Sequence, residues 1–154
     1  MIKDIINLEH LDMVVNAIRI AEQIIDDFND KFKDSDFSLN IYPVPRGGIA
    51  CAYLTAGYIP TKIKFVNDPT EADIAIDDVI DSGRTKDKIL KLNPNLKFYA
   101  FYENPTAWLV FPYERTLDEE NTSIDDAITR ILEYRGKLGE MDFEEAKQCI
   151  LDVL

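Results

Sequence analysis

The sequence predicts an α/β fold, in which a single domain holds a mostly parallel sheet flanked by helices. Apolar runs typical of strands alternate with helical stretches over the first two thirds of the 154 residues, and this is the chain order that parallel sheets need. One run, Ile74-Ala75-Ile76, is apolar at consecutive positions, as expected of a strand buried on both faces. The last third has helical periodicity, which predicts a C-terminal helical extension.

The first predicted element is a helix from Leu8 to Phe28, with Asn7 as its N-cap. Its apolar residues recur at helical spacing: Leu11, Val14, Val15, Ile18, Ala21, Ile25 and Phe28. A polar break at 29–36 precedes the first strand. Strands are expected at 37–44, 62–66, 72–79, 96–102 and 108–111, and helices at 49–56 (closed by Gly57), at 86–92, and from Ser123 and Asp142 onward. We expect one domain over 1–154, with a core at about 8–114 and the helical extension at about 121–154.

Composition excludes several classes of partner. The formal charge is −12, from 29 acidic and 17 basic residues, which opposes binding to nucleic acids or anionic membranes. A phosphate ligand would therefore need backbone donors, a few local cations or a metal ion. The first residues lack the apolar core of a signal peptide and no apolar run could span a bilayer, so we expect a cytoplasmic protein. Cys51 and Cys149 are far apart in sequence, and we interpret both as small buried hydrophobes.

One segment combines paired carboxylates with an anion cradle. Asp77 and Asp78 end the apolar strand, and a tight turn with Gly83 leads into a helix. Glycine lets the backbone approach a phosphate, and the N–H groups of a helix N-terminus can bind it. Carboxylates would repel that phosphate unless they face hydroxyl groups or a divalent cation. A sugar phosphate meets both conditions; the alternative is an acidic turn capped by Ser82.

This segment resembles the phosphoribosyl pyrophosphate motif of type I phosphoribosyltransferases, an acidic pair followed by Asp-Ser/Thr-Gly-x-Thr. The resemblance implies that Asp77 and Asp78 bind the ribose hydroxyls and Mg²⁺, and that Asp81 accepts a proton near the base. It also implies that a run of five residues wraps the 5′-phosphate: Asp81, Ser82, Gly83, Arg84 and Thr85.

Two further segments support the resemblance. Arg46-Gly47-Gly48 follows a strand and resembles the family's pyrophosphate loop, in which Arg46 would add charge for the leaving diphosphate. The segment that begins at Trp108 resembles the base-pocket run of the xanthine, guanine and hypoxanthine enzymes, which implies that this ring stacks on a purine. The alternative for Trp108 is a core or interface aromatic.

The sequence departs from the family at three places. Purine-specific members have a lysine that reads the 6-oxo group, whereas Glu103 or Asn104 stands there in this chain, and an asparagine side chain brings no charge. Only residues 67–71 remain of the flexible loop that closes over the reactants in active members. The gap between Asn104 and Trp108 is also compressed.

Two functions follow from the resemblance. The first is Mg²⁺-dependent transfer of phosphoribose from phosphoribosyl pyrophosphate to a purine-like nucleobase, with release of diphosphate. The second is a non-catalytic protein that binds phosphoribosyl pyrophosphate or a nucleotide and serves a regulatory role, which the short loop at 67–71 favours. The family often dimerises, which makes a homodimer one candidate assembly, although the sequence does not identify the oligomeric state.

Overall fold

The computed structural model describes residues 4–112. The chain divides into two units, Met1–Leu109 and Val110–Leu154, and the described residues comprise most of the first unit and the first three residues of the second. The predicted helices that begin at Ser123 and Asp142 lie outside the described residues, as does the rest of the C-terminal extension at 121–154. Within the described part, no helix combines the length and the apolar character that crossing a membrane requires.

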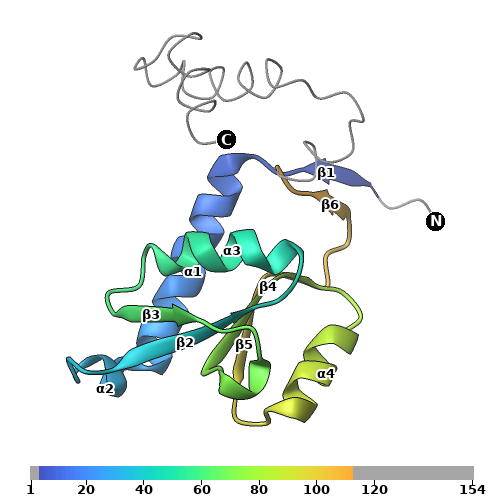
Figure 1. Cartoon of the computed structure of the whole chain (residues 1–154). Helices are drawn as coiled ribbons and strands as arrows, with labels where there is room; N and C mark the ends of the chain where they lie inside the picture. The colour runs from blue at the N-terminus through green and yellow to red at the C-terminus, as the bar shows by residue number, and fades with distance from the viewer. Residues whose placement is uncertain (1–3, 113–154) are drawn as a thin grey trace, which may run out of the picture. The chain divides into compact units, whose positions relative to one another are not determined.

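A four-stranded parallel sheet forms the centre of the first unit (Figure 1). Its strands lie in the order β3 (Lys62–Phe65), β2 (Ser38–Pro43), β4 (Ile74–Ile80) and β5 (Lys97–Glu103). The two central strands carry the most deeply buried side chains, and Leu39, Ile41, Ile74, Ala75 and Ile76 have no exposed surface. The α/β fold with a mostly parallel sheet is therefore confirmed.

Helices cover both faces of this sheet. The crossover from β2 to β3 contains α3 (Gly47–Ala56), and the crossover from β4 to β5 contains α4 (Arg84–Leu92). These two crossovers run toward opposite edges of the sheet, so right-handed connections place α3 and α4 on opposite faces. The long helix α1 (His10–Asp27) packs with α3 and against β5.

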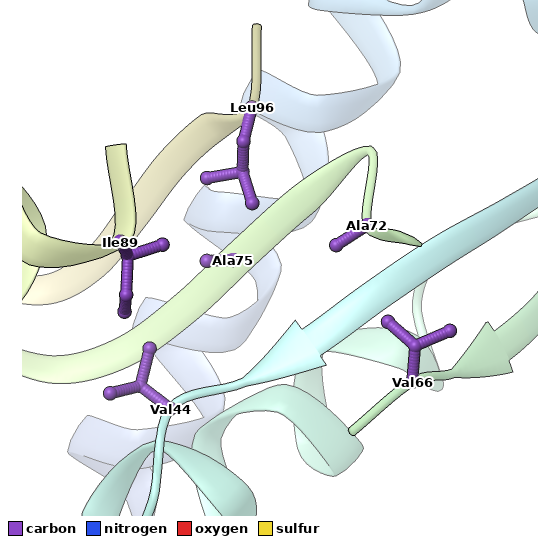
Figure 2. Packing of buried hydrophobic residues seen from close by; sticks show 6 residues of the cluster. All are labelled: Val44, Val66, Ala72, Ala75, Ile89 and Leu96. Carbon is purple, nitrogen blue, oxygen red and sulfur yellow. The ribbon is translucent and has the colours of Figure 1, made fainter. Parts of the chain in front are cut away.

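A compact apolar cluster fixes α4 to the sheet (Figure 2). Ile89 of α4 packs with Ala75 of β4, and residues from the flanking connections complete the cluster: Val44, Val66, Ala72 and Leu96. Val44 also donates its backbone N–H to the Ile76 carbonyl oxygen at 3.0 Å. The cluster thereby holds the segment after β2 and the helix α4 on the same strand, β4.

Three short elements lie where the sequence predicted none. They are β1 (Ile5–Asn7), α2 (Asn29–Phe32) and the 3-10 turn η1 (Pro69–Glu71). β1 pairs with β6 (Trp108–Val110) in a two-stranded sheet. A three-residue strand that pairs across about a hundred residues leaves no periodic signal in the sequence.

The predicted N-cap and apolar face of the first helix are partly wrong. Asn7 belongs to β1, and α1 begins after Glu9, whose backbone N–H donates to Asp12 Oδ2 at 2.7 Å. The buried face consists of Met13, Ala17, Ile20, Ala21 and Ile24, whereas three of the predicted positions, Leu11, Val15 and Ile18, are exposed. The helix carries two apolar stripes, and only packing against α3 and β5 decides which one is buried.

Candidate functional site

The candidate site lies at the carboxyl end of β4, where burial ends. Ile76 has no exposed surface, Asp77 is 7% exposed, and the residues from Asp78 to Ile80 are half-buried. In open parallel sheets, ligands bind at the carboxyl ends of the strands, close to the point where the strand order reverses. The reversal here falls between β2 and β4, because their crossovers run in opposite directions.

The two carboxylates of β4 are held by the backbone. Asp77 Oδ1 accepts from the Asp78 N–H at 2.8 Å, and Asp78 Oδ1 accepts from the Val79 N–H at 2.8 Å. Burial raises the pKa of Asp77 to about 7, and the adjacent Asp78 carboxylate adds to the rise. An ionised Asp77 therefore requires a hydroxyl donor or a cation that this strand does not supply.

The acidic pair suits a metal ion that is shared with a ligand. Among residues 4–112, no group of three or more histidine, cysteine or acidic side chains is placed to hold a metal ion. Mg²⁺ is commonly bound by one or two carboxylates together with substrate phosphates. Asp77 and Asp78 fit that requirement and do not form a closed protein site.

A buried thiol lies beneath the same strand. Cys51 of α3 has no exposed surface, and burial raises its pKa well above the usual range, with the negative charges of Asp78 and Asp77 adding to the effect. The thiol therefore stays protonated, which confirms Cys51 as a small buried hydrophobe. Cys149 lies outside the described residues.

The turn after β4 forms a small open cavity. Gly83 has φ +79° and ψ 0°, a left-handed conformation that favours glycine, and it is the N-cap residue of α4. A Cβ atom at Gly83 would meet nothing within 4 Å, so its backbone is open to a ligand. The cavity measures about 130 Å³ and is lined by Asp77, Val79, Ile80, Asp81, Ser82, Gly83, Arg84, Thr85 and Lys86.

Six of the predicted site residues thus share one cavity, together with three that the sequence did not indicate. Val79 and Ile80 contribute as strand residues beside the acidic pair. Lys86 was predicted as the first residue of a helix, but α4 begins at Arg84 and places Lys86 in its first turn. The helix begins earlier than predicted because Gly83, in its left-handed conformation, is the N-cap residue. The Ser-Gly pair before the helix was the sequence signal for this earlier start.

The predicted pyrophosphate loop lies against the acidic pair. Arg46 is the exposed N-cap residue of α3, and the Pro45–Arg46 peptide bond is cis. A Cβ atom at Gly48 would lie 2.5 Å from the Ile76 carbonyl oxygen and 3.0 Å from the Asp77 Cα. Only glycine allows this approach, so the structure brings the first turn of α3 beside Asp77.

The two predicted base-pocket residues occupy different places. Asn104 follows β5 with φ 46°, and its N–H donates to the Ile80 carbonyl oxygen at 2.8 Å, so it lies beside the end of β4. Trp108 belongs to β6, where its N–H donates to the Asp4 carbonyl oxygen at 2.7 Å, and 65% of its surface is exposed. This exposure excludes a core role for Trp108. Neither residue lines the cavity at Gly83, and their roles toward a base stay predictions.

The short connection between β3 and β4 is fixed far from the acidic pair. Phe65 and Ile74 both pair with Ile41, so the connection returns to the beginning of β4, whereas Asp77 and Asp78 lie further along the strand. The Asn93 Nδ2 amide donates to the carbonyl oxygens of residues 69 and 72, at 2.9 and 3.0 Å. Within the described residues, this segment is a pinned turn and not a lid.

Comparison with known proteins rests on structure alone. No protein-family model and no curated protein matches the sequence. A hypoxanthine-guanine phosphoribosyltransferase from Bacillus anthracis is similar with a TM-score of 0.50 and 20% identity, over 72% of this chain and 82% of that one. A hypoxanthine-guanine phosphoribosyltransferase from Leishmania tarentolae, in complex with GMP, has a TM-score of 0.50 and 19% identity, over 62% and 68% of the two chains.

The chain has the type I phosphoribosyltransferase fold. This fold agrees with the family resemblance of the sequence. The motif at Asp77–Thr85 runs from the end of β4 into the start of α4, as the family pattern requires. A hypothetical protein from Neisseria gonorrhoeae with bound ppGpp is also similar, with a TM-score of 0.51 and 12% identity over 88% of this chain and 99% of that one. At these identities the similarity concerns the fold, and the activity has to be argued from the site.

Proposed function

We propose that this chain binds phosphoribosyl pyrophosphate and transfers its phosphoribose to a purine-like nucleobase, with release of diphosphate. The observation that carries the proposal is the direct passage from an acidic pair into an anion cradle: Asp77 both belongs to the pair and lines the cavity that Gly83 opens. A ligand that spans these groups needs hydroxyls at one end and a phosphate at the other. Phosphoribose has both.

The ribose and its 5′-phosphate would use different parts of the site. The hydroxyl groups would donate to the carboxylates of Asp77 and Asp78, each of which also accepts a backbone N–H at Oδ1. The 5′-phosphate would accept from the backbone N–H groups at the start of α4 and from the hydroxyls of Ser82 and Thr85.

The leaving diphosphate would lie toward Arg46. The first turn of α3 is held against Asp77 by the close approach of Gly48, so the backbone of this turn lies near the ribose end of the site. Arg46, the N-cap residue of α3, would add its guanidinium charge there. Asp77 and Asp78 would hold a Mg²⁺ ion, whose charge would stabilise the leaving diphosphate. The bond from C1′ to the diphosphate oxygen breaks as the bond from C1′ to the base nitrogen forms.

Asp81 is the candidate acceptor for the proton that the base loses. Its side chain is exposed and it lines the cavity between the acidic pair and Gly83. Asp81→Asn should lower turnover by about 10²–10⁴-fold while the affinity for phosphoribosyl pyrophosphate stays within a few-fold. Asp87→Asn is the matched control, because Asp87 is an exposed acid in the first turn of the following helix, α4, and does not line the cavity.

The decisive assay measures diphosphate release. The protein is incubated with Mg²⁺, phosphoribosyl pyrophosphate and a panel of bases, with and without base, and binding is measured in parallel by calorimetry. We expect diphosphate release that depends on a base. A panel with oxo and amino purines tests which base the site prefers with Asn104 in place of the family's lysine, because the asparagine side chain can donate to an oxo group or accept from an amino group. Binding without base-dependent release would exclude the transferase.

A non-catalytic nucleotide-binding protein is the second candidate. The pinned connection at η1 favours it, since closure over the reactants excludes water in enzymes of this kind. The similar Neisseria protein was solved with ppGpp bound. Tight binding of GMP or ppGpp to this chain, together with no diphosphate release for any base, is the result that this alternative predicts.

A further inference from the structure

Three lysines lie on α4, and one of them differs from the others. Lys88 and Lys91 are exposed, whereas Lys86 is half-buried and lines the cavity at Gly83. The protein as a whole is strongly acidic, with a formal charge of −12. A half-buried cation at this one turn therefore calls for a physical reason.

Its position on the helix is electrostatically unfavourable. Gly83 is the N-cap, so Arg84 and Lys86 occupy the first and third positions of α4. The N-terminus of a helix carries partial positive charge, and acidic side chains are the ones that stabilise it. Asp87, in the same turn, has the favourable sign but does not line the cavity. The two cavity cations add to the positive charge of the backbone instead of cancelling it.

Nearby carboxylates do not neutralise these cations. The ion pairs among the described side chains are Lys33 with Asp30 and Lys97 with Asp27. Asp77 and Asp81 line the same cavity as Lys86 and form no ion pair with it. Acidic and cationic side chains therefore line one cavity without an ion pair between them, and an anion bound at the helix N-terminus would relieve the repulsion among the cations.

We propose that Lys86 is a further phosphate-binding residue and that it makes the site select a phosphate dianion, as in a terminal phosphomonoester, over a monoanionic phosphodiester. The inference rests on the proposed function and adds a residue and a charge preference to it. The cavity of about 130 Å³ has room for a phosphate group. Two cations with the helix N-terminus interact with a dianion about twice as strongly as with a monoanion at the same place.

Two probes of different charge test this preference. Ribose 5-phosphate and its 5′-methyl phosphodiester are titrated into the full chain by calorimetry at about pH 8, where the first is a dianion and the second a monoanion. We expect Lys86→Gln to weaken ribose 5-phosphate binding roughly tenfold, the loss of one charge-assisted hydrogen bond. The same change should weaken the diester roughly threefold or less, and it should flatten the salt dependence of dianion binding.

Two control variants separate a charge effect from a structural one. Lys86→Arg keeps the charge and should restore most of the dianion affinity, while Lys88→Gln removes an exposed charge from the same helix and should change affinity by less than about twofold. Equal affinity of the wild type and Lys86→Gln for ribose 5-phosphate would overturn the inference, as would an equal loss for both probes. If the wild type binds neither probe, the proposed function fails; if it binds and Lys86→Gln behaves like the wild type, only the role of Lys86 fails.

Discussion

The buried carboxyl of Asp77 should make the protein less stable as the pH rises. In the unfolded chain this group ionises near its ordinary pKa of 3.8, whereas burial keeps it protonated in the folded protein up to a pH of about 7. Between these values the folded state binds more protons than the unfolded state, so the free energy of unfolding falls with rising pH and levels off above about 7.

The size of this change in unfolding free energy follows from the difference between the pKa of Asp77 in the folded and in the unfolded protein. About three pH units at about 1.4 kcal/mol each gives roughly 4 kcal/mol as the upper bound. Asp77 lies at the mouth of a cavity and retains 7% exposure, so water reaches it and we expect about half of that bound. Asn is isosteric with the protonated acid and its amide oxygen can still accept from the Asp78 N–H. Asp77→Asn should therefore stabilise the protein by roughly 2 kcal/mol at pH 8 and by little at pH 4.

Urea unfolding of both proteins at a series of pH values measures this difference. Asp68→Asn is the control, because Asp68 accepts from the Thr70 N–H and hydroxyl and these bonds lower its pKa. That carboxyl is ionised in both states above pH 5, so the control should leave the slope between pH 5 and 8 unchanged. A stability difference between Asp77→Asn and the wild type that stays constant from pH 4 to 8 would refute the reasoning. Mg²⁺ with phosphoribosyl pyrophosphate should reduce the difference, because a bound cation favours the ionised acid.

Two further predictions concern the backbone around the site. Gly48→Ala should cost about 1–3 kcal/mol, because its Cβ would lie 2.5 Å from the Ile76 carbonyl oxygen; Gly57→Ala, whose nearest contact is 3.4 Å, should change stability by less than about 0.5 kcal/mol. Chemical unfolding compares the two, and equal effects would mean that the backbone of α3 moves freely. Asn93→Ala should cost about 1–3 kcal/mol, because it removes the side-chain donor to two carbonyl oxygens, of which, within the described residues, only that of residue 69 keeps a backbone donor, the Ala72 N–H. Faster hydrogen exchange in the β3–β4 connection should accompany that loss, whereas exposed Asn95→Ala should change neither quantity.

Local sequence was enough to predict the turn between the acidic pair and α4. The apolar run, the two acids and the Ser-Gly turn are consecutive, so their order alone places the acids at a strand end and the glycine at a helix start. The left-handed conformation of Gly83 adds a second reason for a glycine there, one that the sequence did not indicate. The alternation of strands and helices predicted the parallel sheet for a similar reason, since each element spans a few consecutive residues.

Contacts between distant residues were beyond prediction from the sequence. β1 exists because it pairs with β6, and the buried side of α1 depends on the neighbours that pack against it. In the same way, a glycine is required at position 48 because α3 lies against β4. The residues near Gly48 in the sequence do not indicate this contact.

The sequence by itself determined the sheet, the acidic pair and the cradle, because hydrophobic period and turn chemistry act within a few residues. Tertiary structure alone decided that Gly48 touches Asp77, that the β3–β4 connection is pinned away from the site, and that Lys86 turns into the cavity. Each of these depends on how two elements pack, and burial then sets the charge state of Asp77. The physical reason is that packing and desolvation are properties of the assembled fold, which one-dimensional patterns do not encode.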